Sequence, residues 1–166
     1  MNDQLRSELL KLRTTRTAGA FLLVAVALTL LGAFAEGLSG TLDELAQQDT
    51  QRALFAGAAT SAAFMATFVG LLALTSEFRY GTIRSTLLFE PRRRVVLASK
   101  LTTAALAGIL FGVVCVVLSF VAGFAILAAR DVDFALTGAQ ALVIVFGPIL
   151  GSALSAMLGV TVGALI

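Results

Sequence analysis

The residues of this chain that could carry out chemistry are few. Glu77 and Glu90 could act as a general acid and base, Cys115 is the single cysteine, and the chain has no histidine. Both glutamates stand among arginines, where a solvated carboxylate that balances positive charge is the common case. Cys115 lies in an apolar run, GVVCVVL, which favours a packing role over a reactive one. None of these groups predicts a catalytic centre.

Motifs of the common catalytic and cofactor sites are also missing from the sequence. It contains no G-x-x-x-x-G-K-[ST] phosphate loop, no G-x-S-x-G nucleophile elbow and no cysteine–histidine cluster. We therefore expect no catalytic residue, no cofactor and no metal in this chain, and we do not predict an enzyme.

The remaining reactive side chains gather in residues 76–100, SEFRYGTIRSTLLFEPRRRVVLASK. This segment holds six of the twelve basic residues and lies between two long apolar runs. So many charges cannot lie in lipid, so the segment is predicted to be a loop on one side of a membrane. Its excess of arginine indicates the cytoplasmic side.

The composition indicates an integral membrane protein. Hydrophobic residues make up 58% of the chain and charged residues 13%, and the mean hydropathy is +0.97. Crossing a bilayer as a helix takes about 20 apolar residues. Four intervals are long enough: 17–35, 53–75, 101–129 and 139–166. Strand-like alternation is absent, so the predicted fold is all-α with four transmembrane helices, the last kinked at Pro148.

The N-terminal segment, residues 3–16, is predicted to be a short amphipathic helix. Leu5, Leu9 and Leu12 recur at helical spacing, and basic residues flank them. Such a helix would lie in the membrane interface, where its basic side chains reach lipid phosphates.

The charges of the loops predict the orientation of the chain. Residues 1–16 and 76–100 are basic, whereas 36–52 and 130–138 are acidic. This alternation is typical of a four-span protein of the cell inner (plasma) membrane with its N-terminus in the cytoplasm. Because topology accounts for the basic residues, no nucleic-acid partner is expected.

Small residues recur at every fourth position in three of the predicted spans, a spacing that allows helices in lipid to pack closely. They are Ala58, Ala62, Ala66 and Gly70 in the second span, Ala104, Gly108 and Gly112 in the third, and Gly147, Gly151, Ser155, Gly159 and Gly163 in the fourth. The last five, here called the glycine stripe, predict a packing face that lies either within the chain or between subunits.

The predicted spans contain no ionisable side chain. Proton- and ion-coupled transporters place such groups at membrane depth, so active transport by this chain would need energy from elsewhere. The hydroxyls of the spans would suit an amphipathic or lipid-like cargo; they include Thr60, Ser61, Thr67 and Ser119.

The central loop resembles the signature of the ABC type-2 permeases, the membrane subunits of one class of ABC transporter. The matching residues are Glu77-Phe78-Arg79-Tyr80-Gly81-Thr82-Ile83-Arg84, then Leu87, Leu88, Pro91, Arg92, Arg93 and Ala98-Ser99-Lys100. The segment from Leu5 to Arg16 also resembles the N-terminal helix of that family. The match covers about forty residues in motif and the whole chain in topology. The family's membrane domain has six spans, so the resemblance implies that residues 1–166 are its first four spans or a shortened permease.

The resemblance implies a permease subunit of an ATP-driven transporter, an exporter that binds a cytoplasmic ABC ATPase subunit. A second permease subunit, identical or homologous, would complete the path. In the coupling loop, 76–100, Ile83 and Leu87 would form the apolar face of a short docking helix with Arg84 beside them. Glu77 and the arginines would orient it. Gly81 would permit a sharp turn after the second span, the short helix would run from Thr82 to Leu88, and Pro91 suits the first turn of the next helix.

Two other functions compete with this interpretation. A non-transporting scaffold or sensor could use the same basic loop to recruit a partner or anionic lipid. A small proton-driven efflux protein is disfavoured, because no carboxylate is predicted in the spans.

Overall fold

The structure of the protein is a computed structural model that describes residues 16–79 and 93–165. These residues form five helices: α2 (Arg16–Ser39), α3 (Leu42–Leu45), α4 (Gln48–Arg79), α6 (Arg93–Ala129) and α7 (Gly138–Gly163). The predicted interfacial helix of residues 3–16 lies outside the described residues, apart from Arg16, which begins α2.

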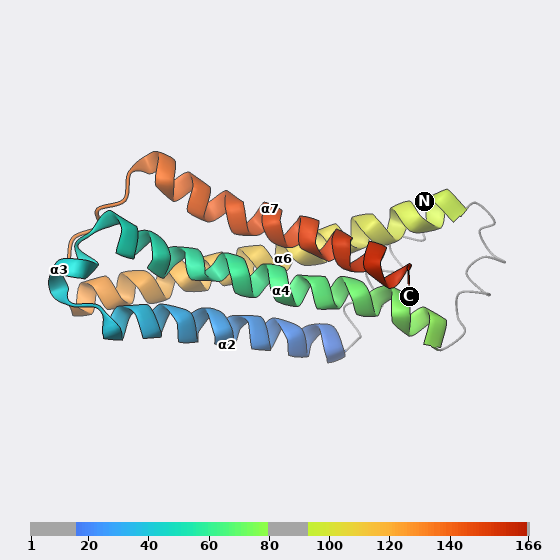
Figure 1. The fold of residues 1–166 in the computed structure, drawn as a ribbon, viewed down its shortest axis with the longest axis horizontal. Coiled ribbons are helices and arrows are strands. Elements are labelled where there is room, and N and C mark those ends of the chain that lie inside the picture. The colour runs from blue at the N-terminus through green and yellow to red at the C-terminus, as the bar shows by residue number, and fades with distance from the viewer. Residues whose placement is uncertain (1–15, 80–92, 166) are drawn as a thin grey trace.

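The four long helices form an up-and-down bundle (Figure 1). Each is long and apolar enough to cross a membrane. The predicted all-α protein with four membrane spans is confirmed at this level. Two ends of the bundle are distinguished below. The α3 end carries α3 and residues 130–137, and the coupling end is the one from which residues 80–92 leave α4 and return to α6.

Three helices are longer than their predicted apolar intervals, since α2, at 24 residues, also extends beyond the interval 17–35. The second interval, 53–75, lies within α4, which spans 32 residues, and the third, 101–129, lies within α6, which spans 37. At about 1.5 Å per residue, α6 is about 55 Å long, whereas a bilayer's hydrocarbon core is about 30 Å thick. The apolar run of each helix is therefore shorter than the helix that contains it.

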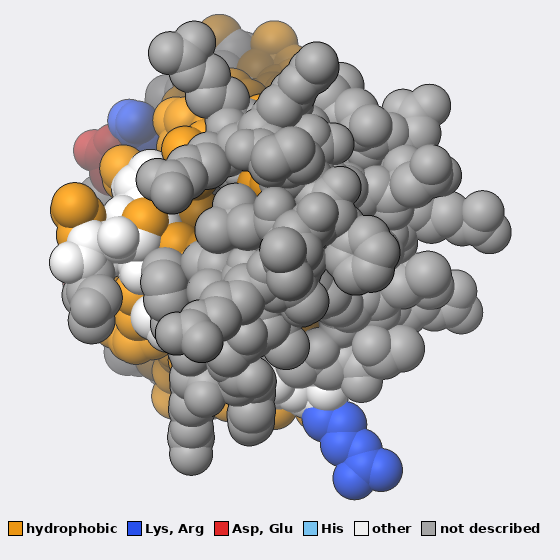
Figure 2. All heavy atoms as spheres, turned by 90° about the vertical axis from the view of Figure 1, so that its right-hand side faces the viewer, with side chains coloured by type: hydrophobic (Ala, Val, Ile, Leu, Met, Phe, Trp, Pro, Cys, Tyr) orange, Lys and Arg blue, Asp and Glu red, His pale blue; other side chains and the backbone are white. Residues whose placement is uncertain are grey.

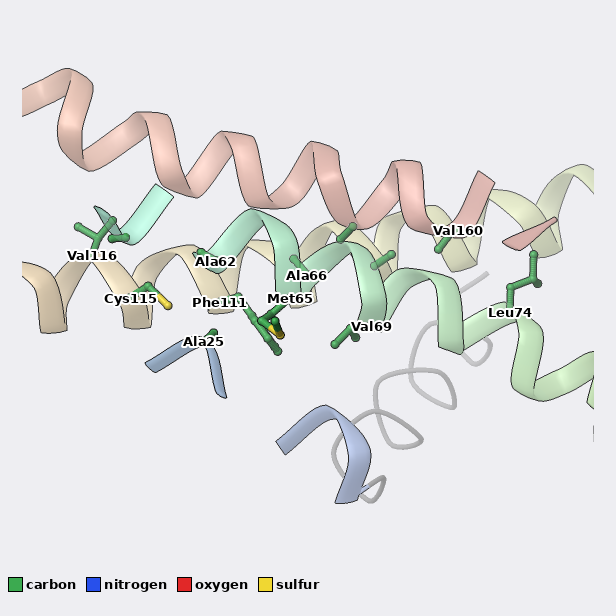
Figure 3. Close-up of a cluster of buried hydrophobic side chains, with 13 residues drawn as sticks. Ala25, Ala62, Met65, Ala66, Val69, Leu74, Phe111, Cys115, Val116 and Val160 are labelled. Carbon is green, nitrogen blue, oxygen red and sulfur yellow. The ribbon is translucent and has the colours of Figure 1, made fainter. Parts of the chain in front are cut away.

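The interior of the bundle is built largely of small side chains. α4 packs against α2, α6 and α7, and its Ala58, Ala62 and Ala66 are almost completely buried. Figure 3 shows Ala62 and Ala66 with Phe111, Cys115 and Val160, where side chains of the long helices meet. Large apolar side chains instead cover the outside of the bundle, where lipid would surround it, among them Leu23, Leu31, Phe64, Val121, Leu154 and Leu158.

Buried hydroxyls join the helices in pairs. Thr29 of α2 and Ser61 of α4 share a hydrogen bond of 2.6 Å. Ser119 of α6 donates to the carbonyl of Phe55 in α4 at 3.0 Å, and Ser152 of α7 donates to the carbonyl of Gly108 in α6 at 2.7 Å. Such bonds favour one arrangement of the helices, because apolar contacts in lipid specify that arrangement only weakly.

The turn after α6 fixes the path of the chain at the α3 end. Asp131 has a φ of 56°, in the left-handed region. Its N–H donates to the carbonyl of Ala128 at 3.4 Å, and the N–H of Val132 donates to that of Leu127 at 3.0 Å. This is the Schellman pattern, in which glycine is the usual left-handed residue. The turn directs residues 132–137 across the end of the bundle.

Pro148 lies inside α7, which the structure shows as one continuous helix from Gly138 to Gly163. The start of α7 is capped locally, because the side-chain oxygen of Gln140 accepts the N–H of Thr137 at 3.1 Å. Pro148 itself is buried, so its ring lies toward the neighbouring helices.

Candidate functional site

The predicted coupling loop lies mostly outside the described residues. Glu77 is part of the last turns of α4, and α6 begins at Arg93. The other predicted site residues of the loop lie in the segment that the structure does not describe: Gly81, Thr82, Ile83, Arg84, Leu87 and Pro91. The structure therefore describes the two helices on either side of this loop, and the docking role of the loop stays a prediction.

The two helices that carry the loop extend beyond the other two. Figure 1 shows α4 and α6 reaching past the start of α2 and the end of α7 at the coupling end. Figure 2 looks onto this end, and the described side chains seen there are mostly apolar (orange). α4 continues past its apolar run to Glu77 and Arg79, and α6 begins with Arg93 and Arg94 ahead of its own apolar run.

The base of the loop is tightly packed. Leu74 of α4 and Val96 of α6 are buried there. Lys100 was predicted to end the loop, but the structure places it within α6, where only 4% of its surface is exposed. α6 already begins at Arg93, seven residues before Lys100, so Lys100 is part of the helix. The described part of the third span thus includes one buried ionisable residue, which hydropathy alone had assigned to the loop.

The backbone of α7 lies directly against the backbone of α4 near the coupling end. A β-carbon on Gly70 would overlap the carbonyl oxygen of Ala156, and one on Gly159 would overlap the carbonyl oxygen of Thr67. Farther along, a β-carbon on Gly163 would lie 3.0 Å from the carbonyl oxygen of Leu71. The two backbones therefore touch, which only glycine permits at these positions.

The glycine stripe is divided between two faces of α7. Gly159 and Gly163 lie against α4, Ser155 is partly exposed, and Gly147 and Gly151 have open space beside them. The buried residues Ile144, Pro148, Ser152, Ala156 and Val160 follow a parallel four-residue repeat on the same helix. The repeat itself therefore does not decide burial. The last two glycines of the stripe are buried because α4 lies against them, whereas no neighbouring atom lies within 4 Å of a β-carbon at the first two.

The alanine and glycine positions of the second and third spans lie in the interior. A β-carbon on Gly108 would lie 2.7 Å from the α-carbon of Ala153, and one on Gly112 would lie 2.6 Å from that of Ile149. Ala104 is 4% exposed. These small residues let α6 approach α7 closely.

Two of the four hydroxyls that were predicted to suit a cargo join neighbouring helices. Ser61 pairs with Thr29, and Ser119 binds the carbonyl of Phe55. Thr67 donates to the carbonyl of Ala63 one turn earlier in its own helix, at 2.8 Å. Thr60 is exposed on the outside of α4. Buried hydroxyls must find partners, so in these described helices three of the four have structural roles.

The charges of the described residues are separated between the two ends. The α3 end carries six acidic residues, Glu36, Asp43, Glu44, Asp49, Asp131 and Asp133, with Arg52 and Arg130. The coupling end carries Arg16, Arg79, Arg93, Arg94 and Lys100, with Glu77. One acidic group has a defined partner, because the Thr41 N–H donates to Glu44 at 2.8 Å. That backbone hydrogen bond, with one to the Thr41 hydroxyl, holds the pKa of Glu44 below its ordinary value.

Sequence reasoning missed the residues that close the α3 end. Gln51 was assigned to a solvent-exposed loop, yet it is completely buried and its side chain bonds three backbone groups. Phe55, one turn later, is also completely buried and contacts three other phenylalanines. A signal existed in the spacing, since Gln51 and Phe55 are four residues apart at the start of a helix, on one face.

Within the described residues, no three His, Cys, Asp or Glu side chains come together in a way that could hold a metal ion. Comparison with protein-family models, with curated proteins and with solved structures gives no match for this chain. The likeness to the ABC type-2 permeases therefore rests on the residues of the central loop and on the number and order of the spans.

Proposed function

We propose that this protein is the membrane-spanning permease subunit of an ATP-driven ABC transporter, an exporter coupled to a separate ATPase through residues 76–100. The observation that carries the proposal is the order Glu77, Gly81-Thr82, Arg84 and Pro91 after the second span, with Lys100 near the start of the third. A soluble ATPase needs a docking element that stands clear of lipid. The charged residues at the end of α4 and at the start of α6, Glu77 and Arg79 with Arg93 and Arg94, support such a role for the loop between them.

The orientation that the proposal requires is supported by the separation of charge. The positive-inside rule places the end with more lysine and arginine in the cytoplasm, and the coupling end is the basic one. The N-terminus and residues 76–100 would then face the cytoplasm of a cell bounded by this membrane, and the α3 end would lie outside.

A second permease subunit is part of the proposal. The described interior of one copy contains many alanines and backbones in direct contact. This close packing does not favour a transport path through a single copy. A path between two copies, with outward faces such as that of Gly147 and Gly151 available for contact, fits this packing better. An alternation between two packings would then move cargo.

Charging the apolar face of the loop tests the proposal. Ile83→Asp and Leu87→Asp are expected to release the ATPase, because a buried unpaired charge at an interface costs about 2–5 kcal/mol. Glu77→Ala is expected to lower transport more than binding, if its role is to orient the loop. The measurement is co-purification of an ABC ATPase subunit expressed together with this chain, alongside the membrane abundance of each variant.

Leu42→Asp is the matched control. Leu42 is exposed at the α3 end, so the same change there should leave co-purification unaltered. Undiminished co-purification with both loop variants would remove this loop as the docking element and favour the scaffold or sensor.

A further inference from the structure

Residues 132–137, here called the strap, connect α6 to α7 across the α3 end without forming a helix. Two residues of α4 hold it. The side-chain nitrogen of Gln51 donates to the carbonyl of Asp133 at 2.8 Å, and its side-chain oxygen accepts the N–H of Ala135 at 2.9 Å. The same nitrogen donates to the carbonyl of Leu45 in α3 at 3.0 Å. One amide thus joins α3, α4 and the strap.

The residue of the strap between these two contacts is held by an aromatic cluster. The ring of Phe134 lies edge-on to that of Phe55, with 5.9 Å between ring centres, and 5.3 Å from that of Phe124. Phe55 also contacts the ring of Phe120 at 4.9 Å. A β-carbon on Gly123 would overlap the Phe55 ring, so this glycine makes the recess in α6 that receives it.

These contacts form two layers with different properties. The aromatic layer excludes water, since Phe55 has no exposed surface. The polar layer consists of the neutral Gln51 amide and its three hydrogen bonds. Water that reaches this amide can replace those bonds. The strap has no helical hydrogen bonds to retain its position, and its Phe134 is 42% exposed.

We propose that the strap is a lock that closes the α3 end of the bundle, and that Gln51 is its release point. When the Gln51 bonds exchange for water, the strap lifts, Phe134 leaves Phe55 and water enters between α4 and α6. This device does not depend on the proposed transport function, because it follows from the contacts of one copy.

The chain contains its own reporter for this opening. Cys115, the single cysteine, is completely buried in α6. It lies one turn deeper than Ser119, which binds the carbonyl of Phe55. A water-soluble reagent that enters from the α3 end must pass the aromatic layer to reach the thiol.

The experiment measures the rate at which a sulfonated maleimide labels Cys115 in the purified, folded protein in detergent. The wild type is expected to be strongly protected relative to the same protein in SDS. Gln51→Ala should label about ten- to a hundredfold faster, because three hydrogen bonds no longer oppose opening. Gln47→Ala is the matched control, since Gln47 lies one turn earlier in the sequence with an exposed side chain, and it should label at the wild-type rate.

Two further variants keep the test decisive. Gln51→Leu retains most of the volume but removes the hydrogen bonds, and it should also label faster if Gln51→Ala fails to accumulate. Phe55→Leu weakens the aromatic layer and should accelerate labelling with Gln51 intact. Wild-type labelling rates in Gln51→Ala or Gln51→Leu, rapid labelling of the wild type, or failure of both Gln51 variants to fold would each overturn the proposal.

Discussion

Gly159 of α7 lies so close to Thr67 of α4 that a β-carbon on the glycine would overlap the threonine carbonyl oxygen. The two helices therefore touch backbone to backbone, one turn from the equally close approach of Gly70 to Ala156. Because Thr67 and Gly70 precede the loop-bearing end of α4, this contact sets where that end lies relative to α7.

Substitution of Gly159 should weaken the fold. Gly159→Leu must push α7 away from α4, and overpacking of this kind costs about 1–3 kcal/mol or more. We expect a clear fall in the thermal unfolding temperature in detergent. Gly151→Leu is the control, because the same side chain on the same helix meets open space, and its unfolding temperature should match the wild type.

The same pair of variants also tests the subunit interface. If a second copy covers Gly151, Gly151→Leu should reduce the dimer fraction in size-exclusion chromatography while monomer stability stays unchanged. Equal unfolding temperatures for Gly159→Leu and the wild type would contradict the close approach of α4 and α7.

The turn after α6 offers a prediction of the opposite sign. Asp131 adopts a left-handed conformation that costs a residue with a β-carbon about 1 kcal/mol relative to glycine. Asp131→Gly should therefore maintain or raise stability, whereas Asp131→Val should lower it, since a β-branched residue is the least tolerant of positive φ. Chemical or thermal unfolding of the three proteins measures this order. A Val variant as stable as the Gly variant would show that the turn does not require this conformation.

Cysteine labelling tests the orientation. In a Cys115→Ala background, Gln47→Cys at the α3 end should react with an impermeant maleimide added to intact cells. Arg84→Cys in the coupling loop should react only after the membrane is permeabilised. This outcome follows from the excess of basic residues at the coupling end. Labelling of Arg84→Cys in intact cells would reverse the assignment and remove the cytoplasmic loop from the proposed function.

The sequence by itself determined the class of the protein and the number of spans. Apolar runs of sufficient length can be satisfied in lipid only as helices, so the four spans could be placed from hydropathy alone. It also determined which positions permit close packing, because Ala62, Ala66 and Gly70 of α4 lie in the interior as their spacing predicted.

Only the tertiary structure decided which small residues are in contact and which polar residues are buried. Gly147 and Gly159 belong to the same four-residue repeat, yet Gly147 has open space beside it and Gly159 touches α4, because the neighbouring helix lies against only one of them. Gln51 reads as a loop residue until the strap, 82 positions away from it at Asp133, folds back over it. Contacts between segments so distant in sequence depend on how the helices assemble, and no local pattern encodes them.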